Sequence, residues 1–563
     1  MFIIMIFLPL LILLGSIFQG VAMFRTSLVY SYGIGYWGPL ARDGIWHEAL
    51  IGQLTKSVFP ENPGLAGVKL ENYHYFYDLL ATRLMALLSG PFPRFFVLYI
   101  FFPVVFSILL GVGTYFLTNR LFNNKFISLV AVFLAYFGSS FGWILEYPRS
   151  GEVGGESAFW ANQPVSMNLN PPFAISLVLV IFAALFLSSY IEHPRKLLAV
   201  LLIVLSGSLI GFKAYAGVLI LGALFLLCLK KIVVDKSLVL VPIFVFTLLL
   251  ALIFYLPRNS QSYNLLQIQP LWLVDTMIDA GDRVGIPNLT ARRFAYLGSQ
   301  KWVYFGLLEL LSISIFFIGN LGTRIVALAG FNRKYLKSDL HVFILFIMGA
   351  SAILPLIFVQ KGNPWNIVQF LYYFLYFSAL WAAAGVFRIY KSLPKTSSII
   401  FLVVFIFVTP ISSVATFRSW LYPNPPAYLP LEEYSALNFL SNQEDGVVLK
   451  HPYDRSLRDK YPDPYPLAVY ADNAYVSSYS RKAVFVEDVE QQIVLGADYQ
   501  KRLEDTQRFF IEKDMAWSRE FLKSNSIDYI YLPKIYFLPV AEEEYPMTKI
   551  FENEAVNIYK VLH

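Results

Sequence analysis

Asp43 begins the stretch of this 563-residue chain in which side chains able to do chemistry are densest. His47 and Glu48 follow it closely, and His74 and Asp78 come later in the same stretch. A carboxylate can accept a proton from an attacking hydroxyl, and imidazole together with carboxylate suits several divalent ions. The residue types therefore leave two chemistries open: general base catalysis by Asp43, and metal binding by His47, His74 and Asp78.

Two helices are expected to position these side chains. Apolar residues from Trp46 to Leu54 recur at helical spacing, which predicts an amphipathic helix on the membrane surface with Asp43 as its N-cap. A second such helix is expected over 70–88, where His74 and Asp78 would share one face. A His and an Asp one turn apart also form an ordinary hydrogen-bonded pair, so metal binding is one of two interpretations. Residues near Asp43 that could contact a sugar are Tyr36, Trp37, Trp46, His47 and Glu48.

The composition places these residues in a membrane protein. Hydrophobic residues make up 57% of the chain and charged residues 15%, against roughly 45–50% and about 25% in soluble domains. An ordinary soluble enzyme is therefore excluded, and nothing points to a nucleic-acid partner. The single cysteine, Cys228, excludes an internal disulfide framework and a zinc-binding pair of cysteines.

Charge divides the chain near residue 417. Residues 417–563 hold 23 acidic and 16 basic side chains, whereas residues 1–416 hold 15 acidic and 28 basic ones. The first part is therefore expected to be a transmembrane domain, and the second a soluble domain joined by a proline-rich linker at 422–430. Alternating helix-like and strand-like segments predict a small α/β fold for the second, with no chemistry of its own. These segments are 431–440, 446–450, 483–486, 499–523, 527–532 and 556–561.

A spanning helix needs about 20 mostly apolar residues, and eleven segments are candidates. The first lacks the basic start and the cleavage site of a signal peptide, so a helix is expected there. The fold class is therefore mainly α: a polytopic bundle of about eleven transmembrane helices with a C-terminal α/β domain. The segments are 2–24, 95–118, 126–144, 172–191, 197–212, 214–229, 238–256, 302–329, 341–359, 365–390 and 398–416.

Every second connection between these segments is short and basic, with thirteen cationic residues against three acidic ones. This positive-inside pattern predicts a multi-pass protein of the plasma membrane with a cytoplasmic N-terminus. With an odd number of spans, the C-terminal domain would be extracytoplasmic. The long connections, 25–94, 145–171 and 257–301, would lie on that same outer face, where loops on a rigid scaffold can carry chemistry.

The order of these features resembles the GT-C superfamily of integral membrane glycosyltransferases. That superfamily includes the protein mannosyltransferases, the aminoarabinose transferases of lipid A and the oligosaccharyltransferases. The resemblance covers the whole chain as an architecture: a first span, a large outer loop with an early Asp, many further spans and a soluble C-terminal domain. At residue level it rests on the Asp43 region, on Asn170-Pro-Pro-Phe173 and on Gly362-Asn-Pro-Trp-Asn366.

The resemblance implies transfer of a hexose or pentose from a polyprenyl-phosphate donor to a lipid, glycan or protein acceptor of the cell envelope. Asp43 matches the family's catalytic carboxylate and would act as general base in an inverting reaction. Many members have a second acidic residue directly after it, where this chain has Gly44. A divalent cofactor, Mg²⁺ or Mn²⁺, therefore stays an open alternative.

Such a reaction needs cations to hold the donor phosphate. Basic residues at the predicted outer ends of spans also snorkel to lipid headgroups, which is the alternative for each of them. Glu309 lies inside a predicted span and has no assigned role. The predicted phosphate ligands are Arg258, Lys361, Arg292, Arg293 and Lys213.

Two other functions remain open. One is a transporter or flippase of lipids or glycans, although such proteins place broken helices at mid-membrane in matching halves, and no internal repeat is detectable here. The other is a non-catalytic membrane assembly protein whose soluble domain binds a partner.

Overall fold

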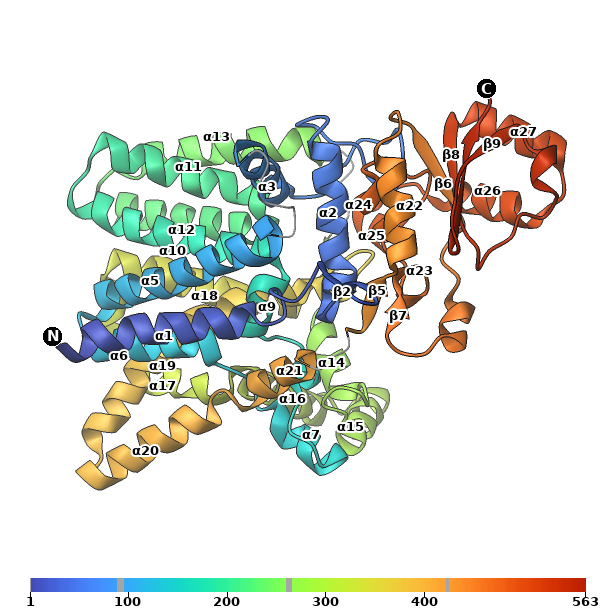
Figure 1. Cartoon of the computed structure of the whole chain (residues 1–563). Coiled ribbons are helices and arrows are strands. Elements are labelled where there is room, and N and C mark those ends of the chain that lie inside the picture. The colour runs from blue at the N-terminus through green and yellow to red at the C-terminus, as the bar shows by residue number, and fades with distance from the viewer. Residues whose placement is uncertain (1, 89–95, 260–265, 422–424) are drawn as a thin grey trace. The chain divides into compact units, whose positions relative to one another are not determined.

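The structure, a computed structural model, describes residues 2–88, 96–259, 266–421 and 425–563 (Figure 1). Parts of four predicted features lie outside these residues: the end of the first outer loop (89–94), the first residue of the second predicted span (95), part of the third outer loop (260–265) and the start of the linker (422–424).

The chain folds into two compact units, and neither is one continuous stretch. Unit 1 consists of Met1–Val21, Phe102–Pro257 and Asn264–Leu421. Unit 2 consists of Ala22–Phe101, Arg258–Tyr263 and Tyr422–His563. The described part of the predicted outer loop, residues 25–88, therefore folds with the C-terminal residues in unit 2.

Unit 1 is a bundle of helices with one short antiparallel strand pair, β3 (Leu266–Ile268) with β4 (Phe358–Gln360), whose strands are far apart in the chain. In it, α10 packs against both α5 and α11, and α19 packs against α6, α17 and α18. Its helices are α1 (Phe2–Gly20), α5 (Phe102–Phe122), α6 (Lys125–Phe137), α7 (Gly142–Ser150), α8 (Glu156–Phe159), α9 (Gln163–Leu169), α10 (Pro171–Glu192), α11 (Lys196–Phe212), α12 (Ala214–Val233), α13 (Val241–Tyr255), α14 (Trp272–Asp279), α15 (Pro287–Gly298), α16 (Trp302–Leu321), α17 (Ala327–Gly330), α18 (Asp339–Ile357), α19 (Gln369–Ser392), α20 (Lys395–Val408) and α21 (Ile411–Trp420).

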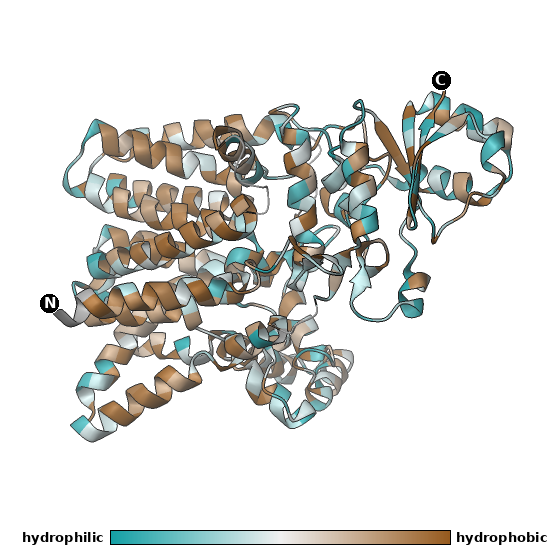
Figure 2. Ribbon diagram, viewed as in Figure 1, coloured by the Kyte–Doolittle hydropathy of each residue, from teal (hydrophilic) through white to brown (hydrophobic). Residues whose placement is uncertain are grey.

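Each of the eleven predicted spans coincides with an apolar helix or a run of helices, shown in brown in Figure 2. Within the described residues, eight are long and apolar enough to cross a membrane, and a bent pair, α6 with α7, makes up to nine. The other two, Ile6–Gly20 and α11, are shorter apolar helices. The chain is therefore a multi-pass membrane protein.

Burial differs sharply among these helices. Of the apolar window in Pro364–Ser392, 89% is buried inside the bundle, against 17% for Val241–Arg258. The helix α19 is thus the centre of unit 1, whereas α13 presents most of its apolar surface outward, as a lipid-facing helix does.

Unit 2 contains two four-stranded sheets, and the first joins residues far apart in the chain. Its order is β1 (Leu28–Tyr30), β2 (Gly33–Tyr36), β5 (Ala427–Leu429) and β7 (Tyr465–Pro466). A Cβ at Gly33 would lie 2.1 Å from the carbonyl oxygen of Leu429, and its φ is +136°. Only glycine fits there, so this residue allows the outer loop to pair with the C-terminal part.

The second sheet has the order β6 (Val447–Lys450), β8 (Ile527–Pro533), β10 (Val556–Val561) and β9 (Met547–Glu552). Strands β6 and β8 are parallel, and β10 is antiparallel to both of its neighbours. Helices accompany the two sheets, as expected of an α/β fold. They are α2 (Asp43–Leu54), α3 (Phe76–Leu87), α22 (Leu431–Ser441), α23 (Leu467–Tyr470), α24 (Tyr475–Ser480), α25 (Val489–Leu495), α26 (Gln500–Ile511) and α27 (Met515–Ser524).

Two predicted elements of this part differ in the structure. Residues 483–486 form only an isolated bridge between Val448 and Val484. The long helix expected over 499–523 is two helices, α26 and α27, because the side chain of Asp514 caps the second by accepting from the backbone N–H of Trp517.

Candidate functional site

Helix α2 holds Asp43 at its first helical position, where the side chain is exposed. Every residue from Gly44 to Leu54 is buried, because α2 packs against α3, α24 and the turn at Gly38–Ala41. The prediction of an amphipathic helix on the membrane surface is therefore wrong. The N-cap is Arg42 rather than Asp43, so the carboxylate of Asp43 is not the cap that the sequence suggested.

Glu48 is a buried carboxylate whose hydrogen bonds are structural. It accepts from the hydroxyls of Tyr99 at 2.7 Å, Ser478 at 3.2 Å and Tyr36 at 3.4 Å. These bonds offset the cost of taking a charge out of water. Tyr36 also contacts the hydroxyl of Tyr479. Glu48 thus joins α2 to α24 within unit 2.

The aromatic residues predicted to stack on a sugar lie in the core. Tyr36 is 0% exposed, Trp37 1% and Trp46 3%. A ring that stacks on a sugar needs a free face, and these faces pack against protein. The predicted substrate-binding set thus includes four buried side chains that stabilise α2 and its surroundings, namely Tyr36, Trp37, Trp46 and Glu48.

His47 and Asp78 form a buried pair instead of a metal site. Nδ1 of His47 lies 2.7 Å from Oδ1 of Asp78. Burial raises the pKa of Asp78, and the nearby His47 partly opposes that rise. His74 precedes α3 and stacks on Tyr73, so it is not on one helical face with Asp78.

The predicted metal ligands His47, His74 and Asp78 therefore do not converge on one point. Among the described residues, no three His, Cys, Asp or Glu side chains are arranged to hold a metal ion. The Mg²⁺ or Mn²⁺ that the resemblance left open does not fit these residues.

Arg42, the residue before Asp43, interacts with acidic residues from the C-terminal part of unit 2. Burial alone would lower the pKa of the Arg42 guanidinium, but Asp488, Glu490 and Asp43 together raise it. Arg42 is also ion-paired with Glu490. Burial raises the pKa of Asp488 well above its ordinary value, and Asp472 raises it further. We name Arg42, Asp43, Asp472, Glu487, Asp488 and Glu490 the Arg42 cluster.

Four acidic members of the Arg42 cluster, Asp472, Glu487, Asp488 and Glu490, were not predicted, because no chemistry was expected in the C-terminal part. One signal for them was available: Glu487, Asp488 and Glu490 place three carboxylates within four residues. Their approach to Arg42 depends on the pairing of β2 with β5, which joins segments almost 400 residues apart.

The predicted phosphate ligands fall into different environments. Arg293 is 5% exposed and ion-paired with Asp275, with Asp279 at 2.9 Å and with Glu309 at 2.9 Å. Three carboxylates therefore hold the guanidinium of Arg293, and its role as a phosphate ligand stays a prediction. The same contacts give Glu309 the partner that an acidic residue in a span requires.

Three of the remaining cations are accessible at least in part. Arg258 is half-buried, with its guanidinium 4.5 Å from the ring centre of Tyr75 and 5.0 Å from that of Phe76. Arg292 and Lys361 are exposed. Arg292 and Lys361, and in part Arg258, can therefore offer N–H groups to a ligand from solvent.

Lys213 lies at the break between α11 and α12 and is 4% exposed. Its Nζ donates to Oδ1 of Asn170 at 3.2 Å. The side-chain amide of Asn170 donates to Gln369, and that of Gln369 donates to Asn366. The Asn170–Phe173 and Gly362–Asn366 motifs therefore meet beside a buried ammonium group in unit 1.

Lys361 belongs to the same neighbourhood. Tyr215, whose ring centre is 5.5 Å from Nζ of Lys213, donates from its hydroxyl to Gln360 at 2.6 Å. Gln360 precedes Lys361 in the chain. The chain at Lys361 is thus one residue away from a side chain that Tyr215, the neighbour of Lys213, contacts.

No family model and no curated protein matches the chain. Among solved structures, it is similar to the archaeal oligosaccharyltransferase AglB from Archaeoglobus fulgidus in complex with an inhibitory peptide and a dolichol-phosphate. The identity is 13% and the TM-score 0.47, over 94% of this chain and 69% of that one. For the apo form of the Archaeoglobus fulgidus enzyme, the identity is 13% and the TM-score 0.48, over 93% of this chain and 69% of that one. For the complex of that enzyme with Zn and sulfate, the identity is 13% and the TM-score 0.48, over 93% of this chain and 68% of that one.

Proposed function

We propose that this protein is an inverting membrane glycosyltransferase. It would move a hexose or pentose from a polyprenyl-phosphate-linked donor to a lipid, glycan or protein acceptor at the extracytoplasmic face of the plasma membrane. Asp43 is the general base of this reaction.

The observation that carries the proposal is the contrast along α2. Eleven consecutive residues, Gly44 to Leu54, are buried, whereas the one carboxylate before them is exposed. A general base needs both features: a rigid support, and an oxygen that a substrate proton can reach within hydrogen-bond distance. Asp43 gains orientation from α2, and its first-turn position suits a negative charge at the positive end of the helix dipole.

In the reaction, the acceptor oxygen attacks the anomeric carbon from the face opposite the donor phosphate. The acceptor gives its proton to the carboxylate of Asp43, and the bond between the anomeric carbon and the phosphate oxygen breaks. The polyprenyl phosphate leaves with the bonding electrons as an anion, so no strong general acid is required. The sugar changes its anomeric configuration once.

The leaving phosphate needs positive charge that is already in place. Lys213 and Lys361 are the cations that we propose for this role from the sequence, and within unit 1 the side chain of Asn170 orients the ammonium of Lys213. A preorganised cation stabilises charge that develops in the transition state without reorganising at that moment. Arg258 and Arg292 are further cations that could contact the donor headgroup.

The test is transfer from a synthetic polyprenyl-phosphate sugar of known anomeric configuration in membranes that contain the full chain. NMR of the product gives the configuration of the new glycosidic bond. A single inverted product supports the proposal. A product that retains the donor configuration contradicts direct attack assisted by Asp43. Donor that crosses the membrane without any sugar transfer would instead identify a transporter or flippase.

A further inference from the structure

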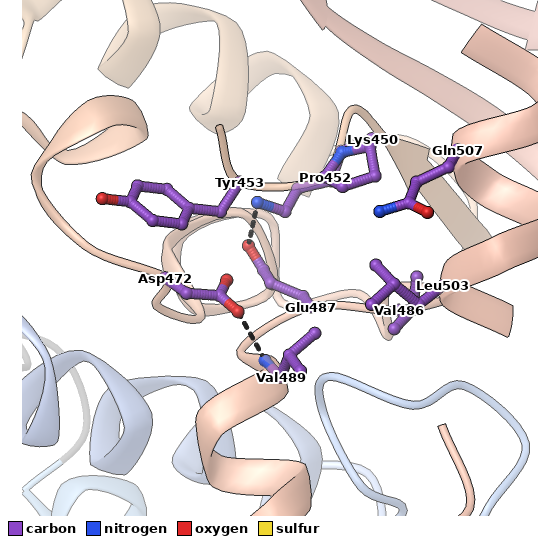
Figure 3. A pocket seen from close by; sticks show the side chains of 9 residues that line it. All are labelled: Lys450, Pro452, Tyr453, Asp472, Val486, Glu487, Val489, Leu503 and Gln507. Atoms are coloured by element: carbon purple, nitrogen blue, oxygen red, sulfur yellow. Dashed lines mark hydrogen bonds and ion pairs between the residues drawn. The ribbon is translucent and has the colours of Figure 1, made fainter. Parts of the chain in front are cut away.

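A cavity in unit 2 is not used by the proposed reaction. It measures about 180 Å³ and lies where β6 ends, beside the segment before α25 and the side of α26 (Figure 3). Polar side chains that line it are Lys450, Tyr453, Asp472, Glu487 and Gln507. We name this space the Lys450 pocket.

The protein fixes two carboxylates at the Lys450 pocket. Glu487 is 2% exposed and accepts from the backbone N–H groups of Val476 at 3.0 Å and Ser477 at 3.1 Å. Asp472 accepts from the backbone N–H of Val489 at 2.7 Å through Oδ2. These bonds set the direction of each carboxylate and leave acceptor capacity on Asp472 through its second oxygen.

Lys450 is buried beside these carboxylates but keeps donor capacity. Its Nζ lies 3.6 Å from Oε1 of Glu487, which is too long for a hydrogen bond, and 5.2 Å from the ring centre of Tyr475. An ammonium group has three donors. Figure 3 shows it next to Glu487, on one wall of the pocket, with the side-chain amide of Gln507 on another.

The mixture of groups selects the chemistry of a ligand. One ammonium and two carboxyl groups line the pocket. Burial raises the pKa of Asp472, and the charge of Lys450 partly opposes that rise. The two carboxyl groups would disfavour a phosphate, and the ammonium of Lys450 would repel a cation. A hydroxyl can donate to Asp472 and accept from Lys450 or Gln507. The pocket therefore suits a neutral ligand with several hydroxyl groups.

The size and the remaining walls narrow the ligand further. A cavity of about 150 Å³ holds benzene, so this pocket has room for one six-membered ring. Val486 and Leu503 line it and can contact the C–H face of such a ring. We infer that the Lys450 pocket binds one pyranose ring of a glycan. This goes beyond the proposed transfer, because binding here needs neither Asp43 nor a donor phosphate.

Saturation-transfer difference NMR on the full chain in detergent tests the inference, with the methyl pyranosides of glucose, mannose and N-acetylglucosamine as probes. We expect at least one to bind. Gln507→Ala should weaken its binding about 2- to 10-fold, because one hydrogen bond is lost. Gln507 is exposed, so this variant should fold. Leu503→Trp should abolish binding, because the indole would occupy the ring's place.

The matched control is Glu504→Ala, an exposed change on the same helix that should leave binding unchanged. Asp43→Asn should also bind the probe normally, so failure of this pocket can be told apart from failure of the transfer reaction. If no methyl pyranoside binds, or if inorganic phosphate displaces the probe, the inference is overturned. Equal binding by wild type and by both pocket variants overturns it as well.

Discussion

Arg293 and Lys213 are both buried cations, but they differ in their partners. Arg293 is held by three carboxylates, an arrangement that stabilises the packing of α14, α15 and α16. Lys213 donates to the amide oxygen of Asn170. A buried ammonium is costly, and an anionic ligand beside it reduces that cost. Lys213 lies at the break between α11 and α12, beside the Asn170 motif, and it remains a proposed phosphate ligand.

Replacing Lys213 with Met keeps the length of the side chain and removes its charge. We expect the KM for the polyprenyl-phosphate donor to rise about 10- to 100-fold, since a hydrogen bond to a charged group contributes about 1.5–3 kcal/mol. Steady-state transfer assays at varied donor concentration measure this. Lys236→Met is the control, because Lys236 is an exposed lysine in a predicted cytoplasmic connection. An unchanged donor KM in Lys213→Met would remove Lys213 from the phosphate site.

At the scale of elements, α2 shows what could be predicted from the sequence. Helical spacing correctly predicted that Asp43 to Leu54 form a helix. Its complete burial could not be predicted, because its partner helix α24, which contains Ser478, lies more than 400 residues away in the chain. For the same reason, the acidic members of the Arg42 cluster were missed: local patterns do not report which distant segments meet.

Helix α22 depends on a buried carboxyl group. Glu433 accepts from the hydroxyl of Tyr531 on β8 at 2.9 Å. Burial raises the pKa of Glu433 to about 7, from an ordinary value of 4.5. The folded chain therefore retains a proton that the unfolded chain has already released. This contribution to stability is complete below pH 4.5 and is lost as the pH rises to 7.

We expect the thermal unfolding midpoint of the wild type to fall between pH 5 and pH 8. The side chain in Glu433→Gln cannot ionise, so the unfolding midpoint of this variant should fall less than that of the wild type. At pH 8 the variant should be the more stable protein, by up to about 3 kcal/mol. Tryptophan fluorescence in detergent follows the transition. Glu432→Gln, which changes the exposed neighbour, should behave like the wild type. If the unfolding midpoint of Glu433→Gln falls with pH as much as that of the wild type, ionisation of Glu433 does not cause the loss of stability.

At the scale of the whole molecule, the two units follow from composition only in part. The apolar segments predicted the helices of unit 1, since length and hydropathy are local properties. The charge change near residue 417 did not reveal that residues 22–101 belong with the C-terminal part. That association depends on Gly33, whose conformation and lack of a side chain let β2 approach β5.

The positive-inside pattern predicts which ends of the spans face the cytoplasm. In a Cys228→Ser background, His193→Cys should react with a membrane-impermeant maleimide only after the cells are opened. Ser456→Cys in unit 2 should react in intact cells. Both positions are exposed, so the difference reports the side of the membrane. Labelling of His193→Cys in intact cells would reverse the predicted orientation.

The most direct test of the central claim is the transfer rate of Asp43→Asn in proteoliposomes supplied with a polyprenyl-phosphate sugar and an acceptor. The amide keeps the shape of the side chain but cannot take a proton, so the rate should fall about 10²- to 10⁴-fold. Donor binding should be retained. Asp459→Asn, an exposed change elsewhere in unit 2, should transfer at the wild-type rate. Transfer by Asp43→Asn at the wild-type rate would contradict the account.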